Sequence, residues 1–384
     1  MKKVIIRKTE EIENWRRNIN SEINFIPTMG NLHNGHIKLI STAKNDNSNV
    51  NLVSIFINPL QFDNKLDLEN YPKTIDNDIK ISFSNGADAI FIPSNEDIYP
   101  PNNKNIKFLK APIELSSALC GLNRIGHFDG VCTVVYRLLN LIKPKNLYLG
   151  EKDWQQLLIL KNLVLRKKLN VAIKSIPTQR DFDGIPLSSR NVHLSKNERK
   201  LIRFFSSELL EAKKNFQQDK KINLNQIIKK LSAKKISIEY LEHLHPHTLQ
   251  KARLEDNISL LAGAIRCGET RLIDHVFLMK RRPIIAIDGP AGSGKSTVTK
   301  LIAKKLKLLY LDTGAMYRAL SWLMIKESID YKKEKKLQNI LKDISIVFKS
   351  NTNSHQDVYV NNYCVTEEIR SQKISSIVSK ISSI

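Results

Sequence analysis

Residues 23–36 read INFIPTMGNLHNGH, and most of the expected fold can be worked out from them. The run from Ile23 to Pro27 has the length and apolar composition of a buried strand. The segment from Gly35 to Lys44 has the pattern of a helix that follows this strand. A strand that leads directly into a helix begins a βαβ unit, so the sequence predicts an α/β fold with a parallel sheet.

The alternation of strand and helix continues along the first part of the chain. Further strands are predicted at Asn51–Ile57, Ala87–Ile92 and Leu147–Gly150. A parallel sheet of this kind carries helices on both faces and binds ligands at the carboxyl ends of its strands. We therefore predict a Rossmann-like α/β domain over residues 1–190.

The pattern changes in the middle of the chain. Residues 195–235 are rich in lysine and have a helical period, and short strands are expected at Ser237–Leu241 and Leu260–Ile265. We interpret residues 191–280 as a small α+β domain. The Lys-Arg-Arg-Pro sequence at 280–283 reads as a junction. An apolar run at Ile284–Asp288 then predicts the first strand of a third, α/β domain over residues 283–384.

The composition is basic, with 61 Lys and Arg against 38 Asp and Glu in 384 residues and a net charge of +23. Such an excess favours anionic partners. The lysines are scattered, however, which favours a general bias over a dedicated binding arm. We expect reduced cysteines, because the four lie far apart without a CxxC pair. We find no signal peptide and no membrane-spanning stretch, and expect a cytoplasmic protein without a nucleic-acid or membrane partner.

The sequence His33-Asn34-Gly35-His36 lies between the predicted strand and helix. Backbone N–H groups at a helix N-terminus favour anions, and Gly35 allows a nucleotide to approach the backbone. Two imidazoles one turn apart can stabilise the charge that develops on an α-phosphate under attack. Surface histidines beside a turn glycine would give the same pattern, but the preceding Pro-Thr-Met-Gly makes the segment more specific.

Residues 25–36 resemble the corresponding segment of pantothenate synthetase, also called pantoate–β-alanine ligase, in the HxGH nucleotidyltransferase superfamily. Five further blocks match that family in order, so the resemblance covers about residues 1–280. The blocks are 53–62 (VSIFINPLQF), 71–78 (YPKTIDND), 124–131 (RIGHFDGV), 149–156 (LGEKDWQQ) and 183–191 (DGIPLSSRN). The resemblance implies ATP-dependent condensation of (R)-pantoate with β-alanine to pantothenate through a pantoyl-adenylate, with AMP and diphosphate as products. It also implies a homodimer.

The resemblance assigns roles to individual residues. His36 and His33 would be catalytic, stabilising the transition state of adenylate formation. Gln61 and Gln156, whose amides both donate and accept hydrogen bonds, would bind pantoate and β-alanine. The expected ATP-binding residues are Met29, Gly30, Asn31, Leu32, His33, Asn34, Gly35, His36, Gly150, Glu151, Lys152, Asp153, Gln179, Leu187, Ser188, Ser189 and Arg190.

Some of these residues have a more specific expected task. By resemblance, Asp153 would lie near Mg²⁺, and Gln179 would contact adenine through its backbone. Residues 187–190 look like the superfamily's counterpart of the KMSKS loop, whose hydroxyls and arginine grip the β- and γ-phosphates. We place His127, Phe128 and Asp129 beside the substrate pocket. The alternating His243, His245 and His247 could suggest a metal site. We favour a loop or strand edge there and assign no zinc.

A second phosphate-binding motif follows the junction. Residues 289–296 read GPAGSGKS, which is the GxxxxGKS pattern between a predicted strand and a helix. In such a P-loop, Lys295 would reach the β- and γ-phosphates and Ser296 would bind Mg²⁺. The expected ATP-binding residues of this part are Gly289, Gly292, Ser293, Gly294, Lys295, Ser296 and Thr297.

Residues 311–318 (LDTGAMYR) and 365–371 (VTEEIRS), taken with the P-loop, look like cytidylate kinase. This resemblance implies phosphoryl transfer from ATP to CMP or dCMP, with Thr313, Arg318 and Ser379 facing CMP. Cys364 stands where that family usually has aspartate. The family continues beyond the point matched by Ile384 with further CMP-binding arginines, so we expect a fragment or a copy with impaired kinase activity. A fused chain of both parts resembles the cyanobacterial bifunctional pantoate ligase/cytidylate kinases.

Two other functions fit parts of the sequence. An HxGH protein that acts on tRNA would suit the basic charge, although no anticodon-binding module is recognisable. Alternatively, the ligase would be fused to a nucleotide-binding appendage without enzymatic activity. Such an appendage would bind ATP but form no CDP.

Overall fold

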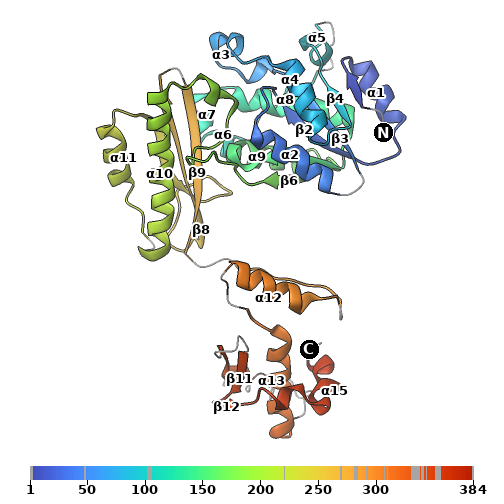
Figure 1. Cartoon of the computed structure of the whole chain (residues 1–384), viewed down its shortest axis with the longest axis vertical. Coiled ribbons are helices and arrows are strands. Elements are labelled where there is room, and N and C mark those ends of the chain that lie inside the picture. Colours follow the sequence, from blue (N-terminus) through green and yellow to red (C-terminus); the bar gives the residue numbers. More distant parts are fainter. Residues whose placement is uncertain are drawn as a thin grey trace. The chain divides into compact units, whose positions relative to one another are not determined.

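The computed structural model describes residues 3–46, 49–101, 106–219, 221–268, 270–280, 284–290, 293–306, 308, 310–329, 338, 341–342, 344–350 and 356–382. The chain divides into two units, Met1–Pro283 and Ile284–Ile384, each with its own elements (Figure 1). The domain boundary that we predict near residue 190 falls inside the first unit and stays a prediction.

A parallel sheet forms the centre of the first unit, which confirms the predicted fold class. Among the described residues it has six strands. Their order is β1 (Val4–Ile6), β4 (Ala89–Phe91), β3 (Val50–Ile55), β2 (Ile23–Thr28), β5 (Asn146–Gly150) and β6 (Ala172–Ile176). The four inner strands were predictable from the sequence, whereas β1 and β6 were not. Both are edge strands with exposed positions, so they lack a continuous apolar run.

Helices cover both faces of this sheet. One face packs against α1 (Thr9–Arg17), α8 (His127–Ile142) and α9 (Trp154–Arg166), and the other against α2 (Asn34–Asn45) and α4 (Ile75–Ser84). Phe25 of β2 lies in the first core, whereas its neighbour Ile26 lies in the second. Successive side chains of a strand point to opposite faces, so a run that is apolar throughout is needed to fill both cores.

The strand order places a crevice above the middle of the sheet. From β2 the chain continues to β3 on one side, and later returns to β5 on the other. Ligand sites of open parallel sheets lie outside the carboxyl ends of the strands at such a switch point. Short helices connect the larger elements of this unit: η1 (Pro59–Gln61), α3 (Lys65–Glu69), α5 (Asn95–Ile98), α6 (Ile113–Ser116), α7 (Cys120–Asn123), η2 (Glu151–Asp153) and η3 (Ser189–His193).

The last third of this unit is a small antiparallel sheet covered by two helices. It comprises β7 (Ser237–Leu244), β8 (Ile258–Cys267) and β9 (Thr270–Met279), with α10 (Lys196–Asp219) and α11 (Leu224–Ala233) (Figure 1). The ring of Phe205 on α10 would lie 2.9 Å from a side chain at Gly263, so the glycine allows this close packing. Sequence analysis missed β9, because the buried Asp274 and His275 interrupt its apolar pattern.

The alternating histidines of this region have local partners. His243 lies on β7, and its Nε2 is 2.7 Å from the Ser259 hydroxyl. His245 follows the strand, and its Nδ1 accepts the backbone N–H of Thr248 at 3.2 Å.

The second unit combines helices with an antiparallel sheet. Its elements are α12 (Lys295–Leu306), α13 (Thr313–Lys326), β10 (Ile346–Ser350), β11 (Gln356–Val360), β12 (Tyr363–Cys364), η4 (Glu368–Arg370) and α15 (Gln372–Ile381). Ala319 and Leu323 of α13 pack against Val360 of the sheet. This packing gives the unit a core of its own.

The strand predicted at residues 284–288 is wrong. The structure has no regular element there, and Ile284 is 93% exposed. An apolar run becomes a strand only when a neighbour pairs with its backbone. The described strands of this unit, β10 to β12, pair with one another instead.

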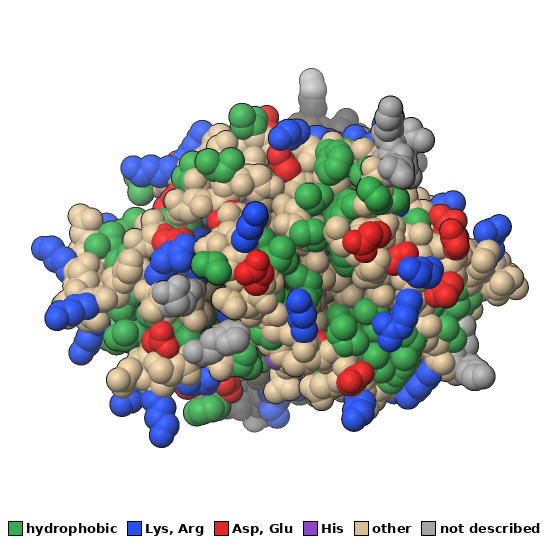
Figure 2. Space-filling model, turned by 90° about the horizontal axis from the view of Figure 1, so that it is seen from above, with side chains coloured by type: hydrophobic (Ala, Val, Ile, Leu, Met, Phe, Trp, Pro, Cys, Tyr) green, Lys and Arg blue, Asp and Glu red, His purple; other side chains and the backbone are tan. Residues whose placement is uncertain are grey.

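Charged side chains are dispersed over the surface in view in Figure 2, where Lys and Arg alternate with acidic and apolar groups. No single basic arm stands out on that face. Among the described residues, no helix has the length and hydropathy needed to cross a membrane.

Candidate active site

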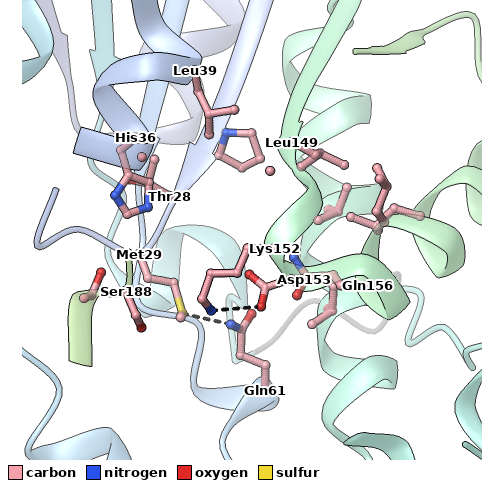
Figure 3. Close-up of a pocket in the computed structure, with 18 of the residues that line it drawn as sticks. Thr28, Met29, His36, Leu39, Gln61, Leu149, Lys152, Asp153, Gln156 and Ser188 are labelled. Carbon is pink, nitrogen blue, oxygen red and sulfur yellow. Dashed lines mark hydrogen bonds and ion pairs between the residues drawn. The ribbon is translucent and has the colours of Figure 1, made fainter. Parts of the chain in front are cut away.

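A cavity of about 280 Å³ lies at the carboxyl ends of β2, β3 and β5 (Figure 3). Residues that follow these strands and residues 177–190 line it. Most residues of the predicted ligase site meet there: Met29, His33, Gly35, His36, Gln61, Gly150, Lys152, Asp153, Gln156, Gln179, Leu187, Ser188, Ser189 and Arg190. Segments more than 150 residues apart in the sequence thus form one site, as a switch-point crevice requires.

The remaining predicted ATP-binding residues do not line this cavity; they are Gly30, Asn31, Leu32, Asn34 and Glu151. The backbone N–H groups of Asn31 and Leu32 donate to the Asp78 carboxylate at 2.9 and 2.8 Å. Asp78 is fully buried, so it fixes the turn that precedes α2. Asp78 belongs to one of the blocks that match the family, but we predicted no role for it from the sequence.

The two histidines have a defined orientation. The Nδ1 atom of His33 accepts the N–H of Gly35 at 3.0 Å, and the Nδ1 atom of His36 accepts the N–H of His33 at 3.3 Å. A neutral imidazole that accepts at Nδ1 carries its proton at Nε2. Both rings can therefore donate from Nε2 into the cavity that they line. A side chain at Gly35 would come within 2.7 Å of the His33 ring, so glycine is needed for this arrangement.

Burial keeps both rings neutral. It lowers the pKa of His36 to about 3, with a further contribution from His33. Burial and the nearby Lys152 lower the pKa of His33 to about 4. At neutral pH each ring is thus an uncharged hydrogen-bond donor, which can stabilise negative charge on a bound phosphate through its Nε2–H.

Lys152 and Asp153 lie side by side in the cavity wall (Figure 3). The Lys152 Nζ lies 3.5 Å from the Asp153 carboxylate. Burial is the largest single influence and raises the pKa of Asp153, but Lys152, His127 and Arg190 together hold this pKa below its ordinary value. Asp153 is therefore ionised at neutral pH. Mg²⁺ is often bound by one or two carboxylates together with substrate phosphates, and a charged Asp153 fits that requirement.

Gln61 is held by several neighbours. Its side-chain amide donates to the Met29 sulfur at 2.8 Å (Figure 3). The same amide accepts from the Asn58 amide at 3.1 Å. The Arg124 guanidinium donates to its backbone carbonyl at 3.1 Å. Arg124 also forms an ion pair with Asp63 at 2.9 Å. Arg124 lies in one of the blocks that match the family, but we predicted no role for it from the sequence.

His127 completes this network. Its Nδ1 lies 2.6 Å from the Gln61 carbonyl, which can only accept, so the ring carries its proton at Nδ1. Burial and Arg124 lower the pKa of His127 to about 4. His127 lines the main cavity, and Phe128 lines a smaller cavity beside it. Asp129 lines neither, because its carboxylate accepts from the backbone of Ala111 and from Lys110.

The segment with Ser188, Ser189 and Arg190 is tied to the β2–α2 turn. The Asn31 amide donates to the Ser189 carbonyl at 2.8 Å, and the Ser189 hydroxyl donates back to the Asn31 carbonyl at 3.1 Å. Arg190 pairs with Asp67 at 2.7 Å. Asn31 thus supports the site from outside the cavity.

The predicted kinase residues lie in the second unit, where Lys295 opens α12 and its Nζ donates to the Gly289 carbonyl. Ser296 and Thr297 follow in the first turn of α12. Gly294 adopts a positive φ of 80°, which the loop–helix transition uses. Ser293 precedes it in the loop, and Gly292 lies outside the described residues.

The predicted CMP contacts are distributed over two helices. Thr313 begins α13, and Arg318 pairs with Asp312, the residue that caps this helix, at 3.4 Å. Ser379 lies on α15, whose Ile381 packs against Met324 near the C-terminal end of α13. The structure therefore brings Arg318 to the start of α13 but puts Ser379 nearer its other end.

Family models match both parts of the chain. A model described as "Pantoate-beta-alanine ligase" matches residues 4–277, and one described as "Cytidylate kinase" matches residues 285–384. A "Bifunctional pantoate ligase/cytidylate kinase" of Prochlorococcus marinus (strain MIT 9215) is 97% identical over 100% of this chain and 75% of its own length. The protein of the same name from strain NATL1A is 48% identical over 99% of this chain and 74% of its own length.

Solved structures resemble the first part of the chain. A pantoate-β-alanine ligase of Francisella tularensis, "complexed with Beta-gamma ATP and Beta-alanine", is 38% identical with a TM-score of 0.62 and covers 72% of this chain and 98% of its own. A pantothenate synthetase of Thermus thermophilus is 32% identical with a TM-score of 0.65 and covers 72% of this chain and 99% of its own.

Proposed function

Because this chain belongs to the bifunctional pantoate ligase/cytidylate kinase family, we propose that its first unit joins pantoate to β-alanine at the expense of ATP. The carboxylate of pantoate attacks the α-phosphorus of ATP and pyrophosphate leaves. The amine of β-alanine then attacks the carbonyl carbon of pantoyl-adenylate, and the C–O bond to AMP breaks. The products are pantothenate, AMP and diphosphate.

The observation that carries this proposal is the pair of neutral imidazoles at the start of α2. His33 and His36 line the cavity and donate from Nε2. Negative charge grows on the α-phosphate oxygens as the carboxylate attacks, and fixed donors stabilise this charge more strongly in a site shielded from water. We assign His36 as the catalytic residue and His33 as its partner.

The other cavity residues bind and orient the substrates. Gln61 and Gln156 offer amide donors and acceptors for the hydroxyl and carboxylate of pantoate, and the network around Arg124 holds Gln61 in place. Apolar side chains on α8, including Val131, Val134 and Leu138, line the same cavity. They exclude water, which would otherwise hydrolyse the mixed anhydride.

Residues around the phosphate end of the cavity complete the ATP site. Lys152 and Arg190 supply positive charge and Ser188 a hydroxyl donor for the phosphates, and Ser189 lines the cavity beside them. Gln179 contributes its backbone to the adenine pocket. Asp153 would hold the Mg²⁺ that accompanies ATP, and this ion would offset phosphate charge.

The ligase proposal is tested with the purified chain, MgATP and pantoate. In the presence of β-alanine, we expect AMP and pantothenate in equal amounts by chromatography and mass spectrometry. Without β-alanine, we expect one pyrophosphate per active site in a single turnover. AMP formation that does not require pantoate but requires tRNA and an amino acid would contradict the proposal. It would favour the alternative that the protein acts on tRNA.

For the second unit, we propose ATP binding at the P-loop and phosphoryl transfer to CMP or dCMP, giving CDP or dCDP. The match of residues 285–384 to cytidylate kinase supports this, together with the position of Lys295 and Ser296 at the start of α12. Thr313, Arg318 and Ser379 are the CMP contacts that we propose, and Ser296 would be a ligand of Mg²⁺. A coupled assay for CDP tests the transfer. ATP binding without CDP formation would identify a nonenzymatic appendage instead.

We also propose that the chain works as a homodimer through its first unit in the cytoplasm, on the strength of the family resemblance. Light scattering of the purified chain checks the dimer, and fractionation of the native cells checks the compartment. A monomer at micromolar concentration would contradict the first part.

A further inference from the structure

Residues 179–187 form a small hairpin with a proposed ATP contact at each end. The Leu187 N–H donates to the Gln179 carbonyl at 2.9 Å, which closes the hairpin. Gly184 turns the chain with a φ of 85°, where other residues would be strained. Gln179 on the adenine side and Ser188 on the phosphate side are thus held by one element.

Arg180 fastens this hairpin to the small antiparallel sheet. Its guanidinium donates two hydrogen bonds to the Asp274 carboxylate, at 2.8 and 2.7 Å. It also donates to the Gly184 carbonyl within the hairpin at 2.9 Å and to the His275 carbonyl of β9 at 3.2 Å. The Asp274 side chain is 1% exposed and that of Arg180 is 20% exposed. A shielded, bidentate pair of this kind has one preferred geometry.

The other end of the segment is fastened to the parallel sheet. Ser189 exchanges two hydrogen bonds with Asn31 in the turn after β2. Between these two anchors, Ser188 lies in the cavity wall. The Arg180–Asp274 pair and the Ser189–Asn31 bonds therefore together fix the position of the hydroxyls and the backbone of this segment.

We propose that Arg180 and Asp274 are positioning residues for ATP: their ion pair makes the small antiparallel sheet part of the ATP site. Neither side chain lines the main cavity, although Asp274 lines the smaller cavity beside it. We assign both residues an action through the hairpin and not by contact with the nucleotide. The assignment of this cavity to ATP rests on the proposed function of the first unit. The pair itself is 94 residues apart in the sequence.

The expected consequence is specific to one substrate. Without the pair, the hairpin keeps its own backbone bonds and the ion pairs of Asp181 and Asp183 with Arg199 on α10, but it loses its bidentate link to β9. We expect the ends of the hairpin to shift, so that contacts to adenine and phosphates weaken together. A displacement of about 1 Å can cost on the order of 100-fold in rate. We expect Arg180→Ala to raise KM for ATP by roughly 10- to 100-fold. The KM for pantoate should change little, because Gln61 lies on another segment.

The experiment measures pantoate-dependent pyrophosphate release by the full-length chain at varied ATP and varied pantoate. Arg180→Lys keeps the charge without the bidentate geometry, and we expect an intermediate KM for ATP. Lys230→Ala is the matched control. It removes the partner of Glu208, whose side chain is 7% exposed, in the same small domain but away from the hairpin. We expect both KM values of this control to equal those of the wild type.

Two further measurements separate positioning from loss of folding. Direct titration with MgATP in a Lys295→Ala background, which disables the second unit's P-loop, should show weaker ATP binding for Arg180→Ala. The charge swap Arg180→Asp with Asp274→Arg should recover part of the affinity. Unchanged ATP binding in Arg180→Ala, or equal rises in both KM values, would overturn the inference. Tight ATP binding with no pantoate-dependent reaction in the wild type would instead contradict the proposed function.

Discussion

The ring centroids of His33 and His36 lie 4.1 Å apart, and each ring accepts a backbone N–H of the same turn at Nδ1. The backbone that begins α2 therefore sets the tautomer of both side chains. This arrangement makes the HxGH segment a pair of neutral donors aimed at one cavity.

The first prediction concerns His36 itself. We expect His36→Ala to lower the rate of adenylate formation by about 100-fold or more, as loss of a fixed donor to a developing charge typically does. Single-turnover release of pyrophosphate measures this step. Lys38→Ala, on the exposed side of the same helix, serves as the control and should retain the wild-type rate. An unchanged rate in His36→Ala would remove His36 from the mechanism.

The second prediction concerns tautomers. At pH 7 we expect the rings of His33 and His36 to carry the proton at Nε2, whereas that of His127 carries it at Nδ1. Nitrogen-15 chemical shifts of the labelled imidazoles distinguish these forms. The pKa values of about 4, 3 and 4 for His33, His36 and His127 also predict no protonation of these rings between pH 8 and pH 6. A titration near pH 6.5 at any of them would contradict the account.

The third prediction links the pKa of His36 to stability. Its folded pKa of about 3 lies below the ordinary 6.5, so the unfolded chain binds a proton that the folded chain does not. Stability contributed by the neutral ring is present above pH 6.5 and is lost as the pH falls toward 3. Between pH 6.5 and 5, the free energy of unfolding should fall by about 2 kcal/mol more in the wild type than in His36→Gln. Urea unfolding of both proteins at pH 6.5 and pH 5 measures this difference. An equal fall in the free energy of unfolding of the wild type and of His36→Gln would refute the prediction.

The fourth prediction concerns the buried Asp78. Asp78→Asn replaces one acceptor by a donor that faces the N–H groups of Asn31 and Leu32. We expect a loss of about 1–3 kcal/mol in the free energy of unfolding. The rate of adenylate formation should fall too, because the turn before α2 is no longer fixed. Asp76→Asn, at an exposed position of the same helix, should match the wild type in both urea unfolding and pyrophosphate release.

The fifth prediction separates the two activities. Lys295→Ala should abolish CDP formation, because the P-loop lysine contacts the transferred phosphate. Pantothenate formation should stay at the wild-type rate, since His36 and its cavity belong to the other unit. Conversely, His36→Ala should lower pantothenate formation and leave CDP formation at the wild-type rate. Measuring both products with both variants checks this independence, and a joint loss in either variant would show that the sites are coupled.

The sequence predicts those elements and site residues whose structure depends on neighbours in the chain. The apolar run of β2 and the HxGH segment adjoin each other, so the fold class and the paired histidines were predictable. Gln61 and Arg190 were found only because their blocks resemble a known family. The roles of Asp78 and Arg180 depend on partners 47 and 94 residues away, which no local pattern reveals.

Strand prediction failed for a related reason. A β-strand is stabilised by backbone hydrogen bonds to a neighbouring strand. The exposed edge strands β1 and β6 are formed because β4 and β5 pair with them. The more apolar run at Ile284 has no paired neighbour among the described residues and forms no strand.

The most direct test of activation through an acyl-adenylate is to follow the transfer of carboxylate oxygen from pantoate to AMP. Pantoate labelled with ¹⁸O in its carboxylate is incubated with the enzyme, MgATP and β-alanine, and AMP is analysed by mass spectrometry. Attack of the carboxylate on the α-phosphorus, followed by cleavage of the C–O bond, predicts one ¹⁸O atom in each AMP. AMP without label, or label released with ADP and inorganic phosphate, would contradict activation through an acyl-adenylate.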